Sequence, residues 1–543
     1  MRRYFNTAGP CNPDWHYMLP AAPRLPEARP LIDRGQYFVV HAPRQTGKTT
    51  TLAAIAEELT DQGDYLALHF SCETGEPAQD DYAEAQRSVL YAITDAARQR
   101  RFPAELLPPD PWPEAPDGNL LAAGLSAWTG SCPLPLVLFF DEIDALRGES
   151  LRSVLRQLRA GYPSRPGEFP HSVVLCGLRD VRDYKAAAGG DPARLGTASP
   201  FNVKVTSLRL GDFTADEVAV LYGQHTELTG QPFTDEAVAR AFAYTQGQPW
   251  LVNALAAEVL DRVPVPEPVT VGHVDEAKER LILARATHLD SLAARLAEPR
   301  VRAVIEPIIG GEVVRVDPYH DDLSYLRDLG LLADAREARI ANPIYKEVIV
   351  RVLGTGTEAN ITDDPRSFVL PDGRLDFGKL LHEFAGFWRA NGEVLTSGEV
   401  YHEVAPQLVI MAYLQRIVNN NVSARNCGAR KLAPRAHTGG YIDREYGVGR
   451  RRIDLVIRWP YADGAGKRVW QYEAVELKVW RPGQADPLAD GLAQLDAYLD
   501  RLGLDRGTLV VFDRRPDAAP IAERTFFAED RTPSGRPVTL VRG

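Results

Sequence analysis

The chain has 543 residues, which is too many for one hydrophobic core, and the usual size of a domain predicts roughly three to five folding units. Hydrophobic residues make up 45% and charged residues 25% of the chain, a composition that excludes a fibrous protein and large-scale disorder. The net charge of -11 excludes a general electrostatic attraction to nucleic acid, so binding of that kind requires a local basic patch.

The sequence also excludes a membrane-spanning helix. No stretch approaches the roughly 18 to 20 consecutive apolar residues that cross a bilayer, and the N-terminal stretch MRRYFNTAGPCNPDWHYMLP lacks the apolar centre of a signal peptide. The five cysteines are scattered without a close pair, which argues against both a disulfide framework and a cysteine-based zinc site. We therefore expect a cytoplasmic protein with reduced thiols and no membrane partner.

The N-terminal part of the chain alternates short strands with helical stretches. Between about residues 35 and 210, the strand-like runs are YFVVH, YLALHFS, LVLFFD, HSVVLCG and FNVKVTSL. This alternation predicts an α/β fold with a parallel sheet, and the nearly continuous apolar runs predict helices on both faces of the sheet. We assign residues 1–210 to this core, including an N-terminal extension.

Four further segments follow. Amphipathic helices opened by the capping residues Thr214 and Thr234 predict a helical subdomain over residues 211–297. A helix, a short β-wing and a second helix predict a winged helix over 298–356, and a segment rich in Gly, Asp and Pro predicts a linker over 357–375. Residues 376–543 read as a second α/β unit.

Residues 42–50, APRQTGKTT, directly follow the strand YFVVH. A strand, a tight loop and a Gly-Lys-Thr sequence that opens a helix form the P-loop arrangement, in which backbone N–H groups surround phosphate oxygens. Lys48 would reach the β- and γ-phosphates of ATP, and Thr49 would ligate Mg²⁺. Ala42 replaces the usual first glycine. The residues expected to contact the nucleotide are Ala42, Gln45, Thr46, Gly47, Lys48, Thr49 and Thr50.

A second motif that a P-loop ATPase requires is an acidic pair at the end of a neighbouring strand. The buried-looking strand PLVLFFD ends in Asp141 and Glu142. Asp141 would hold the Mg²⁺ ion and its water shell, and Glu142 would polarise the water that attacks the γ-phosphate. The alternative is a solvated acidic strand end, but two such elements in one α/β unit favour an ATPase.

The stretch from about residue 35 to 355 resembles the AAA-like ATPases of the STAND and archaeal-type ATPase group. The resemblance implies a helical lid and a winged helix after the core, Arg179 as the sensor arginine, and Gly247 and Pro249 in a lid motif near the nucleotide. It also implies a homo-oligomer formed through the ATPase domain and an unidentified protein trigger, for instance in bacterial defence. For the arginine that acts on a neighbouring subunit, the sequence leaves a choice among Arg156, Arg159, Arg165 and Arg182.

A second chemical site is predicted in the C-terminal unit. Asp454 lies in the run RRRIDLVIRW, and the next run, WQYEAVELKVW, contains Glu476 and Lys478 on the same face of a strand. Carboxylates crowded on an apolar strand pair repel one another, and a divalent cation such as Mg²⁺ would resolve that conflict. Bound there, Mg²⁺ could activate a water for phosphodiester cleavage, while Lys478 would orient that water or neutralise the phosphate.

This segment resembles the PD-(D/E)XK nuclease superfamily. The resemblance makes Asp454 the motif aspartate and Glu476 with Lys478 the E-x-K element, although Ile453 replaces the proline of the superfamily name. It further implies a Q-x-x-x-Y helix with Gln494 and Tyr498, and a first helix in which Glu403 adds a metal-site carboxylate.

Basic residues gather next to this site. Nine Lys and Arg residues lie between Arg425 and Arg458, against three acidic residues, which indicates a surface for nucleic acid, more readily DNA than RNA, or a solvated basic face. The aromatic side chains of Trp459, Trp470, Tyr472 and Trp480 could stack on bases, although strand packing is the simpler reading. The N-terminal segment RYFNTAGPCNPDWHYMLP could close over the adenine or pack on the sheet.

Three functions remain open from the sequence. The first is an ATP-regulated, Mg²⁺-dependent nuclease that cleaves DNA or RNA. The second is a regulatory ATPase whose C-terminal domain binds nucleic acid or protein without cutting. The third, a DNA translocase or replication-initiator-like ATPase, ranks lower because Arg327 alone supplies a basic residue in the run LSYLRDLGLLA.

Overall fold

A computed structural model describes residues 3–178, 204–284, 287–309, 320–358, 365–396, 405–418, 440–448 and 451–543. For residues 443–448 and 451–454 it gives only the backbone. The chain divides into two compact units. Unit 1 comprises Met1–His288 and Val316–Ala335, and unit 2 comprises Leu289–Arg315 and Arg336–Gly543.

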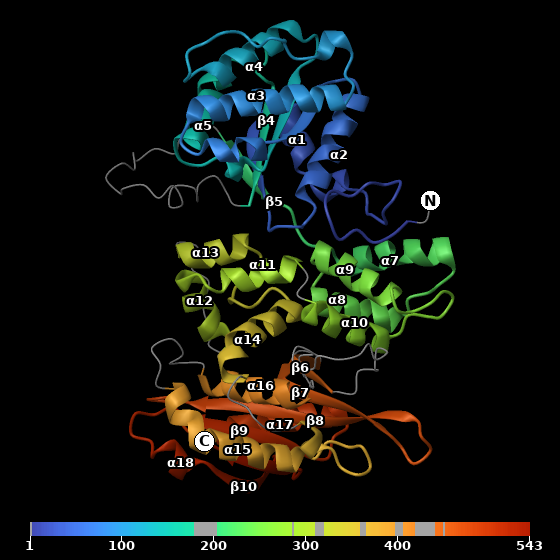
Figure 1. The fold of residues 1–543 in the computed structure, drawn as a ribbon, viewed down its shortest axis with the longest axis vertical. Coiled ribbons are helices and arrows are strands. Elements are labelled where there is room, and N and C mark those ends of the chain that lie inside the picture. Colours follow the sequence, from blue (N-terminus) through green and yellow to red (C-terminus); the bar gives the residue numbers. More distant parts are fainter. Residues whose placement is uncertain are drawn as a thin grey trace, which may run out of the picture. The chain divides into compact units, whose positions relative to one another are not determined.

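Unit 1 is built on a five-stranded parallel sheet with the strand order β2-β3-β4-β1-β5 (Figure 1). Every strand coincides with one of the five predicted runs, which confirms the predicted α/β fold with a parallel sheet. The strands are β1 (Tyr37–His41), β2 (Leu66–Ser71), β3 (Leu136–Asp141), β4 (Ser172–Gly177) and β5 (Lys204–Arg209).

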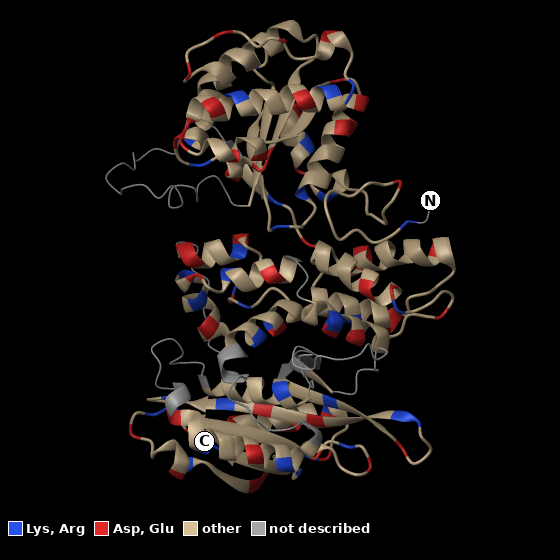
Figure 2. Ribbon diagram, viewed as in Figure 1, with Lys and Arg blue, Asp and Glu red and all other residues tan. Residues whose placement is uncertain are grey.

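Helices cover both faces of this sheet. Alternate residues of β3 point to opposite faces, and all six are buried, so neither face of the strand is solvated. In Figure 2 the strands of this sheet carry few coloured, charged residues, whereas the surrounding helices carry both signs. One face packs against α1 (Ala28–Asp33) and α2 (Lys48–Asp61), and the other against α3 (Tyr82–Gln99), α4 (Leu120–Ser131) and α5 (Gly148–Gly161).

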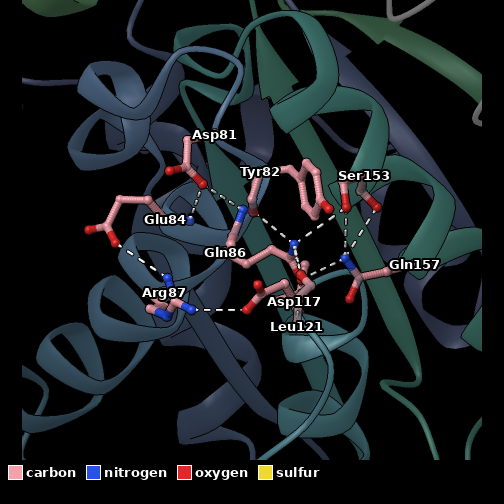
Figure 3. A network of polar contacts seen from close by, with 10 residues as sticks. Asp81, Tyr82, Glu84, Gln86, Arg87, Asp117, Leu121, Ser153 and Gln157 are labelled. Carbon is pink, nitrogen blue, oxygen red and sulfur yellow. Dashed lines mark hydrogen bonds and ion pairs between the residues drawn. The ribbon is translucent and has the colours of Figure 1, made fainter.

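A buried polar network links α3, α4 and α5, the helices on one face of the sheet (Figure 3). Gln86 on α3 accepts a hydrogen bond from the Leu121 backbone N–H and another from the Gln157 amide. Gln157 on α5 in turn accepts from the Ala122 N–H. These two glutamines satisfy first-turn N–H groups of α4, whose N-cap residue, Asn119, makes no side-chain cap bond within the described residues. The network therefore fixes α4 against α3 and α5.

Consecutive helices follow β5 between residues 211 and 284, where the sequence predicts a helical subdomain. The Thr214 hydroxyl accepts from the Glu217 N–H and the Thr234 hydroxyl from the Ala237 N–H, so both predicted caps are confirmed. The helices are α7 (Ala215–Thr229), α8 (Asp235–Thr245), α9 (Pro249–Leu260) and α10 (Val271–Leu283).

The segment predicted as a winged helix is divided between the two units. Val316–Ala335, with α13 (Asp321–Asp328), belongs to unit 1, where a Cβ on Gly330 would lie 2.7 Å from the Pro43 side chain. Residues 310–319 lie outside the described residues, so the winged helix and the predicted domain boundaries stay predictions. The neighbouring helices are α11 (Thr287–Arg295), α12 (Pro299–Ile309) and α14 (Pro343–Glu358).

Unit 2 contains a six-stranded mixed sheet with the order β10-β11-β9-β8-β7-β6. Strands β6, β7 and β8 form an antiparallel meander, and β9 then joins β8 in parallel after the helix α17. The strands are β6 (Tyr441–Val448), β7 (Arg451–Ala462), β8 (Arg468–Trp480), β9 (Gly507–Asp513), β10 (Phe526–Arg531) and β11 (Pro537–Arg542). The helices are α15 (Phe377–Thr396), α16 (Ala405–Val418), α17 (Leu488–Leu502) and α18 (Ile521–Arg524).

Two further predictions can be compared with the described residues. None of the helices placed by the structure is long and apolar enough to cross a membrane. Cys11, Cys72, Cys132 and Cys176 are free thiols, as expected, and Cys427 lies outside the described residues.

Candidate functional site

The loop between β1 and α2 has the backbone of a phosphate-binding loop. Gln45 and Gly47 adopt positive φ angles of 60° and 89°, and such left-handed residues turn successive backbone N–H groups toward one concave side. Gly47 is the N-cap of α2, and no described side chain caps that first turn. The helix N-terminus thus presents N–H groups that an anion can satisfy.

Lys48 is folded back over this loop. Its Nζ donates to the backbone carbonyls of Ala42 and Pro43, each at 2.9 Å, and the residue is 8% exposed. Two neutral carbonyls are weak partners for a buried ammonium group compared with a phosphate anion. Lys48 is therefore held next to the loop by two neutral carbonyls, where its ammonium group is available to a phosphate.

Asp141 lies directly opposite the start of α2. Its Oδ2 accepts from the Thr49 hydroxyl at 2.7 Å and its Oδ1 from the Glu142 N–H at 2.9 Å. Oδ2 also lies 3.0 Å from Nε2 of His69, a residue that the sequence did not single out. Burial raises the pKa of the Asp141 carboxyl, but the hydrogen bonds and charge from His69 and Thr49 outweigh it, so the pKa lies below its usual range.

Glu142 is held in a left-handed conformation with φ 51° at the end of β3. Burial raises the pKa of its carboxyl, and the negative charge of Asp141 raises it further, while Lys48 acts in the opposite direction. A carboxylate with a raised pKa is the stronger base, which suits a group that has to polarise a water molecule.

The fit of a divalent cation can be judged from the donors present. Thr49 and Asp141 bring a hydroxyl and a carboxylate oxygen within 2.7 Å of each other, beside the phosphate-binding loop. Hydroxyl, carboxylate and phosphate oxygens are the hard ligands that Mg²⁺ takes. The residues present therefore fit Mg²⁺ together with a nucleoside triphosphate.

A cavity of about 110 Å³ opens beside the loop, entirely within unit 1. The N-terminal segment forms one side of it, since the Cys11 N–H donates to the Thr50 hydroxyl and the Thr7 carbonyl accepts from Trp250 Nε1. The two roles considered for that segment, closing over the adenine or packing on the sheet, stay predictions. The cavity is lined mainly by apolar atoms, and its residues include Ala8, Met18, Leu19, Gly47, Phe213 and Trp250.

Arg24 connects the loop with the helical segment, and it is a second residue that sequence reasoning missed. Its guanidinium donates to the Thr46 carbonyl at 3.0 Å and to the Gly211 carbonyl at 2.7 Å, and it lies 4.6 Å from the centroid of the Phe213 ring. In the sequence this arginine stands in an irregular Pro-rich stretch, which carries no periodic or motif signal.

The predicted lid motif lies at this same junction. Gly247 has φ 81°, and a Cβ there would lie 1.8 Å from the Phe213 carbonyl oxygen, so only glycine fits. Pro249 begins α9 and lines the cavity, and Gln248 Nε2 donates to the Gln45 carbonyl at 3.4 Å. The structure thus brings Gly247 and Pro249 together with the phosphate-binding loop.

The arginine predictions stay open. Arg179 and Arg182 lie outside the described residues. Arg156 and Arg159 are carried by α5, and Arg165 stacks on Tyr162 and donates to the Tyr162 carbonyl at 2.8 Å. A contact of any of them with a nucleotide or a neighbouring subunit remains a prediction.

In unit 2 the structure brings three of the predicted site residues together. Glu476 on β8 is 2% exposed and accepts from Lys478 Nζ at 2.6 Å. Lys478 Nζ also donates to Oε1 of Gln494 on α17 at 2.7 Å, and Tyr498 is buried one turn further along that helix. Burial of a carboxylate and an ammonium group at one face is costly unless they are paired, as they are here.

Two predicted carboxylates of this site cannot be placed fully. Asp454 lies in β7, whose next residue, Leu455, pairs with Val475, so the backbones of positions 454 and 476 are on adjacent strands. The Asp454 side chain and all of Glu403 lie outside the described residues. Among the side chains that are described, no group of three or more His, Cys, Asp or Glu could hold a metal ion.

The basic and aromatic residues predicted to form a nucleic-acid surface differ in how far they are exposed. Arg458 is 6% exposed and lies next to the contacting rings of Tyr441 and Trp470, so it is not a surface cation. The other basic side chains of that stretch lie outside the described residues. Trp459 is buried in the core, and its Nε1 donates to the Gly373 carbonyl, so its ring is not available to stack on a base. Tyr472 is 40% exposed.

Comparison with known proteins gives distant similarities only. No protein-family model and no curated protein matches the chain. Among solved structures it is similar to the Walker-type ATPase PABY2304 of Pyrococcus abyssi, with 14% identity and a TM-score of 0.45 over 64% of this chain and 99% of that one. It is also similar to the RuvB Holliday junction branch migration motor of Thermotoga maritima (17% identity, TM-score 0.31, 59% of this chain and 90% of that one). The third is Cdc6p from Pyrobaculum aerophilum (14% identity, TM-score 0.31, 62% of this chain and 93% of that one).

Proposed function

We propose that unit 1 is a P-loop ATPase that binds and hydrolyses ATP with Mg²⁺. The observation that carries this proposal is the junction of β1, α2 and β3, where Lys48 lies on the phosphate-binding loop while Thr49 and Asp141 are 2.7 Å apart. The apolar cavity next to Gly47 gives a base a place to bind.

Each residue has a separate task in this proposal. Lys48 leaves its two backbone carbonyls and pairs with the β- and γ-phosphates, and the N–H groups of the loop bind the remaining phosphate oxygens. Thr49 and Asp141 would hold Mg²⁺, which supplies charge neutralisation on the phosphate oxygens when bound. Glu142, with its raised pKa, accepts a proton from the attacking water.

The test compares wild type with Lys48→Ala and Glu142→Gln. We expect Lys48→Ala to lose binding of labelled ATP by at least about tenfold, since a charge-assisted contact is removed. Glu142→Gln should still bind ATP but hydrolyse it at least about a hundredfold more slowly. Lys467→Ala is the matched control, because Lys467 lies in the exposed turn between β7 and β8. Wild-type protein without ATPase activity, or Lys48→Ala with full ATP affinity, would refute the proposal.

We further propose that unit 2 is a Mg²⁺-dependent nuclease under control of the ATPase, acting on DNA more readily than RNA. The contact of Glu476, Lys478 and Gln494 supports this, because Lys478 is poised beside a carboxylate on the strand adjacent to Asp454. The elements predicted together with this reading, a first helix, two neighbouring strands and the helix that carries Gln494, correspond to α16, β7, β8 and α17. The oligomeric state, the protein trigger and a role in defence remain expectations from the resemblance.

The alternative is a unit 2 that binds nucleic acid or protein without cutting. One observation favours it: Glu476 and Lys478 already satisfy each other at 2.6 Å, as a purely structural ion pair would. Single-stranded DNA, double-stranded DNA and RNA are incubated with the protein, with and without Mg²⁺ and ATP. Cleavage by wild type and by Lys467→Ala, but not by Asp454→Asn or Lys478→Ala, supports the nuclease. Binding without cleavage under every condition supports the alternative.

A further inference from the structure

His69 is placed beside the site by the register of the sheet. It lies on β2, and its Cα partner on the adjacent β3 is Phe139, two residues before Asp141. Because side chains alternate along a strand, His69 and Asp141 project from the same face as diagonal neighbours. That face packs on α2, whose first turn carries Thr49.

The contact made by His69 is specific rather than incidental. Its Nε2 lies 3.0 Å from Asp141 Oδ2, and the two side chains are 16% and 2% exposed. A carboxylate with its usual low pKa only accepts hydrogen bonds, so Nε2 carries the proton in this contact. A histidine that only filled space on the sheet would not have to direct a donor to the same oxygen that Thr49 uses.

The two donors on Oδ2 are not equivalent. The Thr49 hydroxyl is the group that a P-loop turns toward a bound cation. Its lone pairs can bind the cation while its O–H still donates to Asp141, so this hydrogen bond has to share its geometry with the cation. Asp141 Oδ1 also accepts from the Glu142 N–H, and the Cys176 thiol donates to the same carboxylate. On Oδ2, His69 is the donor that comes from a strand outside the phosphate-binding loop and that does not itself have to bind the cation.

We propose that His69 is a positioning residue that holds the Asp141 carboxylate in the orientation required to bind Mg²⁺, and so sets the affinity of the nucleotide site for the cation. This inference rests on the proposed ATPase function of unit 1. Hydrogen-bond partners of metal ligands typically change metal affinity about 10- to 100-fold when they are removed.

The experiment measures nucleotide binding, not turnover. The affinity of wild type and of His69→Gln, His69→Asn and His69→Ala for a fluorescent ATP analogue is determined in EDTA and across a Mg²⁺ titration. Gln places its amide nitrogen about where Nε2 stands, whereas the Asn amide is too short to reach Asp141. We expect about tenfold weaker apparent Mg²⁺ affinity in the Ala and Asn variants, near wild-type Mg²⁺ affinity in the Gln variant, and unchanged affinity for the analogue in EDTA in all of them.

His171→Ala is the matched control, because His171 Nε2 also makes one short contact, 2.8 Å to the Ile32 carbonyl, next to the start of β4. Its Mg²⁺ titration should equal that of wild type. Equal Mg²⁺ affinities in the Asn and Gln variants, or a loss in His171→Ala as large as in His69→Ala, would overturn the role of His69 while leaving the ATPase intact. If the Ala variant fails to fold, the comparison of Asn with Gln still decides. Wild type that binds the analogue without any response to Mg²⁺ would overturn both this inference and the proposed function.

Discussion

Replacing Gly247 with alanine tests how much the close contact between the lid motif and Phe213 matters for the stability of unit 1. Alanine at φ 81° costs about 1–2 kcal/mol from backbone strain alone. The added Cβ would also lie 1.8 Å from the Phe213 carbonyl oxygen, so the backbone must move. That movement costs about 1–3 kcal/mol as overpacking, and it weakens the 2.8 Å hydrogen bond from the Phe213 N–H to the Gly247 carbonyl by about 1 kcal/mol. The free energy of unfolding of unit 1 should fall by about 3–6 kcal/mol.

Gly230→Ala is a matched control for this variant. Gly230 has φ 76° at the end of α7, but a Cβ there would have no described atom within 4 Å. It should therefore lose only the strain, about 1–2 kcal/mol. The assay is urea denaturation followed by tryptophan fluorescence and circular dichroism, with the slope of the transition compared among variants. Equal losses for Gly230→Ala and Gly247→Ala would show that the contact with Phe213 costs nothing and would refute the reasoning.

Three more predictions concern stability. Gln86→Leu should lower the free energy of unfolding by about 2–4 kcal/mol, because it leaves the Leu121 N–H buried without its acceptor. In the same denaturation assay the control Gln99→Leu, at an exposed position of α3, should change the free energy of unfolding by less than about 0.5 kcal/mol. Burial lowers the pKa of His288 from 6.5 to about 4, so His288 takes up a proton at a higher pH in the unfolded chain than in the folded one. The free energy of unfolding is therefore highest above about pH 6.5 and falls by about 2 kcal/mol at about pH 5. His288→Phe should remove this loss in thermal melts recorded at the two pH values. Lys478→Met should destabilise unit 2 by about 3 kcal/mol, because it removes the ion pair that Glu476 makes with Lys478 in a buried position. Adding Glu476→Gln to this variant should restore most of the lost stability in thermal melts. A double variant no more stable than the single one would contradict this prediction.

The sequence by itself determined the parallel sheet of unit 1 and the P-loop pattern between β1 and α2. Strands buried on both faces read as short apolar runs, and a P-loop is a local pattern in which glycine and lysine stand at fixed offsets, so both signals lie within a few consecutive residues. The caps at Thr214 and Thr234 belong to the same class, because a cap involves residues only three positions apart.

Only the tertiary structure decided which distant residues surround that loop. His69 reaches Asp141 because of the pairing of β2 with β3, and Arg24 reaches Thr46 and Gly211 across irregular backbone. Neither contact leaves a period or a motif in the sequence, since the partners are separated by 72 and by up to 187 positions and the geometry is set by sheet register and by packing. The burial of Arg458 next to two aromatic rings has the same cause: a basic residue in a basic stretch is expected to be a surface cation, but the pairing of β7 with β6 and β8 places it inside.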